Sequence, residues 1–170
     1  MIVILDNIRS VNNVGSIFRT ADALGIEKIH LGGITPEPLD AFGRPRQQFV
    51  KVSLGAEKNI PWEKAKSVSR LIGRLKKDGF RIIAVEQAEN SVPYHGLKFS
   101  DPAEKVAFVF GNEVDGISKS VLMKCDQVAE IPMRGAMVRQ AHHPRRSRHG
   151  KESLNVAVSF GIVMFRVMYN

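Results

Sequence analysis

The fold is decided near the C-terminus by two short sequences, Ile131-Pro132-Met133-Arg134-Gly135 and Ser153-Leu154-Asn155-Val156-Ala157-Val158-Ser159. The first continues a predicted strand, Gln127 to Ile131, and the second opens a predicted apolar helix, Ser153 to Met168. Between them lies a basic insert, Val138 to Gly150, which contains four arginines, three histidines and no acid. A strand and a helix joined across a polar segment are expected at one end of an α/β sheet.

Strand-like and helix-like segments alternate through the rest of the chain. Short continuous apolar runs predict strands that are buried on both faces of a parallel sheet. The expected strands are Ile2–Leu5, Ile26–Leu31, Phe80–Val85, Val106–Phe110 and Gln127–Ile131, and the expected helices run from the capping residues Asn12-Asn13 to Gly25, from Pro61 to Lys77, from Ile117 to Lys124 and from Ser153 to Met168. Thr35 to Arg46 and Asn90 to Pro102 are expected as connections, with a surface segment with turns after Arg46. The alternation predicts one α/β domain over residues 1–170, with a mostly parallel sheet flanked by helices.

Composition favours a cytoplasmic protein with a polyanionic partner. The chain has 170 residues, 44% of them hydrophobic, and a formal net charge of +8, which favours RNA or another nucleic acid. Arginines of the insert account for half of that charge. The single cysteine, Cys125, excludes an internal disulfide and suits a reducing cytosol. We expect no signal peptide, and no apolar run reaches the ~18 residues that a membrane helix needs.

Three loops carry the residues suited to chemistry, because ligands of open parallel sheets bind at the carboxyl ends of the strands. The first places Asn13 and Arg19 at either end of the first helical turns, where helix capping and a surface arginine are the structural alternative. The second, from Phe110 to Gly116, has a glycine directly after a buried strand, which suits either close approach of a ligand or a tight turn. The third is the interrupted C-terminal segment, in which Ser153 can act at a site or simply cap the last helix.

The three loops carry Asn13-x-Gly15-x-x-x-Arg19-Thr20-Ala21, then Phe110-Gly111-Asn112-Glu113-x-x-Gly116, then Ile131-Pro132-Met133 followed by Ser153-Leu154-Asn155-x-Ala157-x-Ser159. Taken together and in this order, they resemble the three motifs of the SpoU family of RNA ribose 2'-O-methyltransferases, a family of the SPOUT class. The resemblance covers nearly the whole chain and implies a C-terminal deep trefoil knot. Small members of the family tend toward tRNA, so the resemblance favours tRNA as substrate and leaves rRNA as the alternative.

The resemblance also implies a cofactor and a set of site residues. Members of this family bind S-adenosylmethionine inside the knot, and we expect no metal in this chain. The positions that this implies for the cofactor are Val85, Glu86, Gly111, Ile131, Met133, Ser153 and Leu154. The implied catalytic residues are Arg19, Asn13, Glu113, Ser153 and Asn155. Because a guanidinium stays protonated in proteins, we expect Arg19 to hold the phosphate beside the target ribose and to stabilise the developing alkoxide, with phosphate-assisted proton loss as the alternative.

Family members are homodimers, and the resemblance implies that the last helix lies in the interface with the arginine close to the partner's cofactor pocket. The predicted helix from Ser153 to Met168 is apolar on more than one face, which agrees with two buried contacts. For the insert, residues 138–150, we expect a disordered loop; contact with RNA phosphates and damage to the cofactor site are the alternatives, and a zinc site from its histidines is disfavoured because no cysteine or acid accompanies them.

Two other classes of function remain open. A dinucleotide-binding oxidoreductase fits an α/β sheet, although no G-x-G-x-x-G sequence follows the first strand. A non-catalytic RNA-binding module fits the charge, although such a module has no need of Arg19, Glu113 and Asn155 in three separate loops. A third alternative is a methyltransferase of this family whose activity is impaired by the insert in its third motif.

Overall fold

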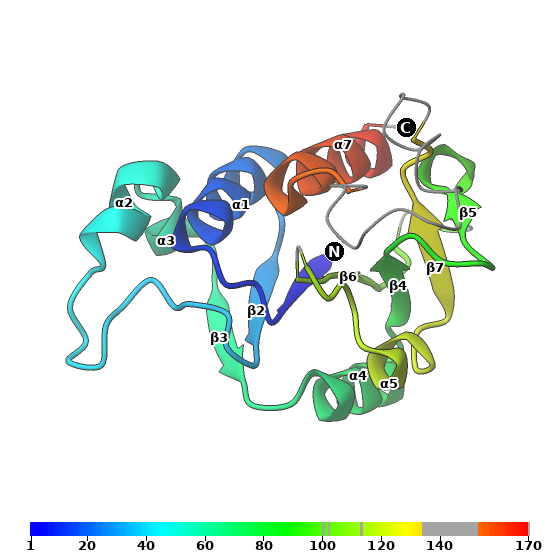
Figure 1. The fold of residues 1–170 in the computed structure, drawn as a ribbon, viewed down its shortest axis with the longest axis horizontal. Helices are drawn as coiled ribbons and strands as arrows, with labels where there is room; N and C mark the ends of the chain where they lie inside the picture. The colour runs from blue at the N-terminus through cyan, green and yellow to red at the C-terminus, as the bar shows by residue number, and fades with distance from the viewer. Residues whose placement is uncertain (100, 102, 113, 134–152, 170) are drawn as a thin grey trace, which may run out of the picture.

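The computed structural model describes residues 1–99, 101, 103–112, 114–133 and 153–169 (Figure 1). Its centre is a seven-stranded sheet with the order β3-β2-β1-β6-β4-β7-β5, in which every pair of neighbouring strands is parallel. The strands are β1 Ile2–Asp6, β2 Lys28–Gly32, β3 Trp62–Ala65, β4 Arg81–Val85, β5 Val92–Pro93, β6 Val106–Phe110 and β7 Gln127–Glu130. The predicted parallel α/β sheet is therefore confirmed.

Helices cover both faces of the sheet. They are α1 Val11–Leu24, α2 Gln47–Ser53, α3 Ala56–Asn59, α4 Val68–Lys77, α5 Lys119–Leu122 and α7 Val156–Met168, with a 3-10 turn η1 at Tyr94–Gly96. Figure 1 shows α1, α2, α3 and α7 on one side of the sheet and α4 and α5 on the other. None of the described helices is long and apolar enough to cross a membrane.

The two-residue period of the central strands divides the core into two clusters. Val3 and Leu5 of β1 pack in the cluster under α1 and α7, whereas Ile2 and Ile4 pack in the cluster against α4. All five residues of β1 are buried, because this strand lies between β2 and β6 and both of its faces are covered. The continuous apolar run at the start of the sequence thus reflects a strand at the centre of the sheet.

The structure corrects the helix that was predicted from Pro61 to Lys77. Residues Trp62–Ala65 form the edge strand β3, which pairs with β2, and the helix begins only at Val68. Ser67 is its true N-cap, since its side chain accepts a hydrogen bond from the backbone amide of Arg70. The apolar stripe was correctly recognised from Val68 onward, but pairing of Trp62–Ala65 with β2 prevails over the helical spacing before it.

Helix caps and one surface segment also differ from expectation. Ser10, not Asn12-Asn13, caps α1: its hydroxyl accepts from the amide of Asn13 at 3.2 Å, and the helix ends at Gly25, whose φ is 67°. The segment after Arg46, expected to be turns, forms α2 and α3. Phe49 of α2 is fully buried and meets Phe18 edge to face at 5.2 Å, which explains why a short helix is stable there.

Candidate active site

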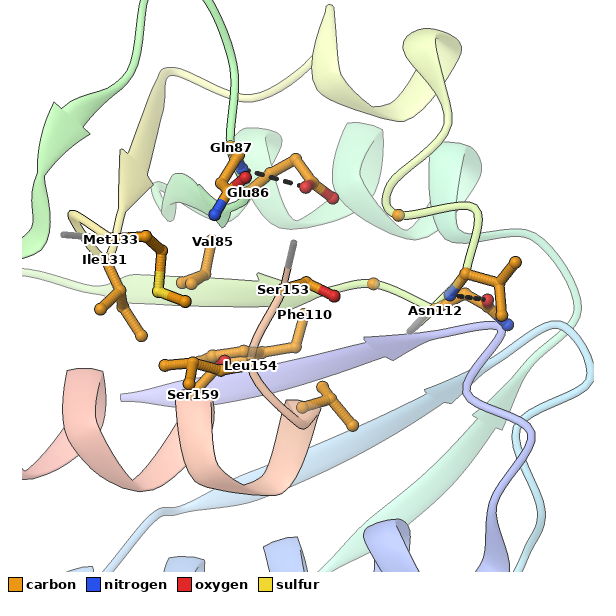
Figure 2. A pocket seen from close by; sticks show the side chains of 14 residues that line it. Val85, Glu86, Gln87, Phe110, Asn112, Ile131, Met133, Ser153, Leu154 and Ser159 are labelled. Atoms are coloured by element: carbon orange, nitrogen blue, oxygen red, sulfur yellow. Dashed lines mark hydrogen bonds between the residues drawn. The ribbon is translucent and has the colours of Figure 1, made fainter. Parts of the chain in front are cut away.

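Loops at the carboxyl ends of β4, β6 and β7 surround a pocket that the start of α7 closes from the other side (Figure 2). The space between its walls is about 720 Å³, part of it open solvent, which lies within the range of small-molecule sites. The lining residues are Val85, Glu86, Gln87, Phe110, Gly111, Asn112, Val114, Gly116, Ile131, Met133, Ser153, Leu154, Val156 and Ser159. All seven residues expected at a cofactor, from Val85 to Leu154, are among them.

The pocket has both the apolar and the polar surface that a nucleoside-like ligand needs. Figure 2 shows the side chains of Ile131, Met133 and Leu154 gathered at the cavity, with the hydroxyl of Ser153 on the side toward the loop after β6. Glu86 and Gln87 follow the end of β4 and supply polar groups on another part of the wall. Apolar walls with a few polar groups are typical of sites for small organic ligands.

Glu86 anchors the loop that forms one wall. Its Oε2 accepts from the amide of Ile117 at 2.8 Å and its Oε1 from the amide of Gln87 at 3.0 Å, while its own amide donates to the carbonyl of Ala129. Glu86 therefore joins the ends of β4 and β7 to the loop after β6. The carboxylate holds the shape of the pocket in addition to lining it.

Asn112 fixes the same loop from within. It is 6% exposed, its Oδ1 accepts from the amides of Val114 and Asp115, and its Nδ2 donates to the carbonyl of Asn7 at 2.8 Å. The last of these bonds ties the loop after β6 to the end of β1. Both bonds to the oxygen and one from the nitrogen of this buried amide hold the loop, so we assign Asn112 a structural role.

Two glycines in this loop have no room for a side chain. A Cβ on Gly111 would lie 2.6 Å from Cγ1 of Ile117, and a Cβ on Gly116 would lie 2.4 Å from Oε2 of Glu86. Gly116 also has a φ of 64°, in the left-handed region that favours glycine. The glycine after β6 thus serves a tight turn, which was one of the two alternatives for it, and it also lines the pocket.

Asn155 connects the first and third of the loops singled out in the sequence. Its Oδ1 accepts from the amides of Ala157 and Val158, so Asn155 is the N-cap of α7. Its Nδ2 donates to Oδ1 of Asn13 on α1 at 3.1 Å. The alternative in which Ser153 caps this helix is wrong, and Ser153 is an exposed residue at the mouth of the pocket.

The predicted catalytic residues are only partly brought together. Ser153 lines the pocket, and Asn13 and Asn155 meet beside the N-terminus of α7. Arg19 lies further along α1, is exposed, forms no ion pair with any described residue and is not among the residues that line the pocket. Glu113 and the insert, residues 138–150, lie outside the described residues.

Several lining residues were not assigned from the sequence. Gln87 and Val156 adjoin assigned positions along the chain and Ser159 ends the third motif. The others, Phe110, Asn112, Val114 and Gly116, lie within the second motif. Their position in or next to the motifs was the sequence signal that could have identified them as pocket residues.

Two titratable groups outside the pocket lining, Cys125 and Asp6, do not offer competing chemistry. Burial raises the pKa of the Cys125 thiol to about 11, so it is protonated and a poor nucleophile at neutral pH. Burial also raises the pKa of the Asp6 carboxyl at the end of β1, where Oδ1 accepts from Nδ2 of Asn7. Among the described residues, no group of three His, Cys, Asp or Glu side chains is arranged to hold a metal ion.

The profile of the SpoU rRNA Methylase family matches residues 1–138. The chain belongs to this family. It is 30% identical over 164 residues to the 23S rRNA (guanosine-2'-O-)-methyltransferase RlmB of Neisseria meningitidis, an alignment that covers 96% of this chain and 56% of that protein. The chain therefore spans about half the length of that SpoU relative.

Solved structures show the same SpoU fold. The AdoMet-bound rRNA methyltransferase from Sinorhizobium meliloti superposes with a TM-score of 0.78 at 28% identity, over 97% of this chain and 54% of that one. The TrmH/SpoU tRNA modifying enzyme of A. aeolicus superposes with a TM-score of 0.74 at 25% identity, over 98% of this chain and 73% of that one. The membership expected from the three motifs is confirmed.

Proposed function

We propose that this chain transfers a methyl group from S-adenosylmethionine to a ribose 2'-hydroxyl of structured RNA, with tRNA as the first candidate and rRNA as the second. The carrying observation is that seven residues from four separate segments, assigned from motifs alone, line one pocket. Family membership supports the reaction class, and the names of the relatives include both an rRNA and a tRNA enzyme. A cytoplasmic site of action goes with such substrates.

The residues of the pocket fit S-adenosylmethionine. Apolar side chains of Ile131, Met133 and Leu154 suit the faces of an adenine ring, and the hydroxyl of Ser153 suits the hydroxyls or the amino-acid part. The carboxylate of Glu86 is already engaged with two backbone amides, so it contributes a fixed wall. When bound, S-adenosylmethionine supplies an electrophilic methyl carbon on a sulfonium centre.

We assign Arg19 to the RNA side of the reaction. The guanidinium is exposed and has no ion-pair partner among the described residues, so it is available to hold a phosphate in a two-pronged contact. In that position it also stabilises negative charge on the ribose oxygen as the proton leaves. Asn13 and Asn155 fix α1 relative to α7, and we place Ser153 and Glu113 beside the reacting ribose.

A homodimer accounts for the position of Arg19. Along α7, Val158, Ile162, Phe165 and Tyr169 recur at helical spacing, and Val158 and Phe165 remain about half exposed. Such a stripe suits a second copy of α7, and α1 packs alongside it. In this arrangement Arg19 of one protomer serves the pocket of the other.

We also propose that the chain forms a C-terminal trefoil knot and that residues 1–170 are a single domain. A C-terminal trefoil knot depends on the path of residues 134–152, which lie outside the described residues, and family membership is what supports it. Residues 1–170 contain one continuous sheet, which supports a single catalytic domain.

Calorimetric titration with S-adenosylmethionine and, separately, with NAD tests the cofactor. The proposal expects saturable binding of S-adenosylmethionine and none of NAD. Binding of NAD alone would support a dinucleotide-dependent enzyme, and binding of neither, together with RNA affinity, would support a non-catalytic RNA-binding module or a site impaired by the insert.

A further inference from the structure

The loop after β2 forms a compact projection, residues 38–46, which we call the Phe42 loop. Backbone hydrogen bonds cross it from Asp40 to the carbonyl of Arg44 at 2.8 Å and from Arg46 to the carbonyl of Pro38 at 2.9 Å. Oδ1 of Asp40 also accepts from the amides of Phe42 and Arg44. These bonds fix the backbone at the tip, although the side chains there are exposed.

The aromatic ring of Phe42 lies at the tip of this loop and packs against no other described aromatic ring. Phe42 is 82% exposed, whereas each of the five largest fully buried side chains of the core is a phenylalanine. The guanidinium of Arg44 lies over the Phe42 ring, 5.6 Å from its centre. One face of the ring is thus held by a cation, and the exposure leaves the other face open to a flat ligand.

Stability of the fold does not explain this residue. An exposed phenylalanine contributes almost no burial energy and favours aggregation when it lies on a hydrophobic patch. Two arginines, Arg44 and Arg46, follow it, and Nε of Arg46 donates to the carbonyl of Leu39, so both cations are positioned on the loop. An open aromatic face beside guanidinium groups is the arrangement with which proteins stack unpaired bases.

The Phe42 loop leaves the sheet at the same edge as the pocket. All strands are parallel, so the ends of β2 and β6 face the same way, and only β1 separates them. Two strand spacings place the end of β2, from which the chain continues to the loop, roughly 10 Å from the end of β6. The neighbouring strand β3 is followed at this edge by Lys66 and Arg70, which are exposed and form no ion pair with any described residue.

We propose that the Phe42 loop is an RNA-docking element in which the Phe42 ring stacks on an unpaired base while Arg44 and Arg46 contact the adjacent phosphates. This inference rests on the proposed function for the identity of the polyanion. An RNA held in this way runs from the pocket across the end of β1 toward β3, where Lys66 and Arg70 continue the positive surface. The element selects RNA with unpaired nucleotides, because bases within a duplex offer no free face.

Three variants test the proposal: Phe42→Ala, Phe42→Trp and the control Met123→Ala. Met123 is 81% exposed but precedes β7, at the opposite edge of the sheet, so it matches Phe42 in exposure and not in position. The probes are a fluorescent RNA stem-loop with unpaired loop nucleotides and a blunt duplex with the same stem. Fluorescence anisotropy gives the affinity of the full chain for each probe, and calorimetry gives the affinity for S-adenosylmethionine.

We expect Phe42→Ala to bind the stem-loop about tenfold or more weakly and the duplex unchanged. Phe42→Trp and Met123→Ala are expected to match the wild type, and S-adenosylmethionine binding is expected to be equal in all four proteins. Equal affinity of Phe42→Ala and wild type for the stem-loop would overturn the proposal, as would equal losses on both probes or no stem-loop binding by the wild type. A changed sedimentation coefficient without RNA would instead make the loop a protein contact.

The outcomes also separate this inference from the proposed function. If the wild type neither binds S-adenosylmethionine nor methylates RNA, but Phe42→Ala still loses stem-loop affinity, the methyltransferase assignment fails and the docking element stands. If methyl transfer occurs with unchanged RNA affinity in Phe42→Ala, only the docking element fails.

Discussion

Nδ2 of Asn155 donates a hydrogen bond to Oδ1 of Asn13 at 3.1 Å, joining two helices whose contact residues lie 142 positions apart in the sequence. Asn155 at the same time caps α7 through its Oδ1, which accepts from the amide of Ala157 at 2.9 Å. One side chain therefore sets the start of the last helix and its register against α1. Since Ser153 and Leu154 immediately precede this cap, the bond also positions the pocket mouth.

Replacing Asn155 separates its two roles. Asn155→Ala loses the cap and the bond to Asn13, and it is expected to lower the free energy of unfolding by about 1 kcal/mol. Asn155→Asp keeps an N-cap acceptor at the positive end of the helix and is expected to stay close to wild-type stability while losing the donor to Asn13. Urea unfolding measures the stabilities; equal losses in the two variants would contradict the capping role.

Gly116→Ala tests the link between Glu86 and the loop wall. The new Cβ meets Oε2 of Glu86 and displaces its bond to Ile117, so we expect S-adenosylmethionine affinity to fall about tenfold. Gly79→Ala is the matched control, because Gly79 also has a positive φ but a Cβ there meets nothing within 4 Å. Both variants share the cost of the left-handed backbone, roughly 1–2 kcal/mol in stability. Calorimetry should show lost affinity in Gly116→Ala alone; similar losses in both would point to general destabilisation.

Arg19→Ala is expected to reduce methyl transfer by about 100-fold or more and to leave S-adenosylmethionine affinity and stability nearly unchanged. Arg19 is exposed and does not line the pocket of its own chain, which is why the cofactor should not sense its loss. Arg19→Lys keeps the charge without the planar fork and should recover only part of the activity. Loss of cofactor binding in Arg19→Ala would contradict the assignment.

Mixing the variants tests where Arg19 acts. If the arginine serves the partner's pocket, a mixture of Arg19→Ala and Gly116→Ala protomers that has exchanged subunits contains one intact composite site and regains activity. At limiting S-adenosylmethionine, where Gly116→Ala is expected to transfer little methyl group, a mixture no more active than the average of its components would place Arg19 at its own pocket or exclude a dimer.

Acid should destabilise the β2–β3 edge through Glu63. A hydrogen bond from Lys28, helped by one from Arg74 and opposed by partial burial, lowers the pKa of Glu63 to about 2 from its usual 4.5. Because the folded pKa is depressed, the stabilisation is present above pH 4.5 and is lost as the pH falls toward 2. The Glu63→Gln variant should have a lower free energy of unfolding at neutral pH, and that free energy should change less with pH in this window. Urea unfolding at a series of pH values measures both. Exposed Glu89→Gln is the control, and parallel profiles for wild type and Glu63→Gln would contradict the prediction.

His30 contributes in a separate pH range. Burial lowers the pKa of His30, whose Nδ1 lies 3.1 Å from Oε1 of Glu63, so the unfolded chain takes up its proton first. Stability from His30 is therefore lost as the pH falls below its usual 6.5, above the window of Glu63.

Segments were predictable from the sequence where their own hydrophobic pattern and capping residues match their burial in the folded chain. The apolar run of β1 and the end of α1 at Gly25 carry their own burial and capping signals, whereas the N-cap Ser10 was missed in favour of Asn12-Asn13. Pocket-lining positions such as Val85 and Leu154 were expected from motif order alone, because their side chains resemble ordinary core residues. Sheet topology then brought them together.

The remaining features depend on contacts that a linear pattern does not contain. Trp62–Ala65 is a strand because β2 offers an edge for it, and its own sequence continues the helical spacing of α4. Ser153 and Asn155 are both good caps, and the choice of Asn155 follows from the position of Asn13 on another helix. The proposed place of Arg19 at a partner's pocket rests on a second copy of the chain, which a single sequence does not describe.

Transfer of the radiolabelled methyl group of S-adenosylmethionine to purified tRNA and 23S rRNA decides whether the chain is an RNA ribose methyltransferase. Alkaline hydrolysis follows, since a ribose 2'-O-methyl group protects the adjacent phosphodiester. We expect label in alkali-resistant dinucleotides, lowered about 100-fold or more by Arg19→Ala and less by Gly116→Ala. Label confined to mononucleotides, or no label in either RNA under conditions where the cofactor binds, would contradict it.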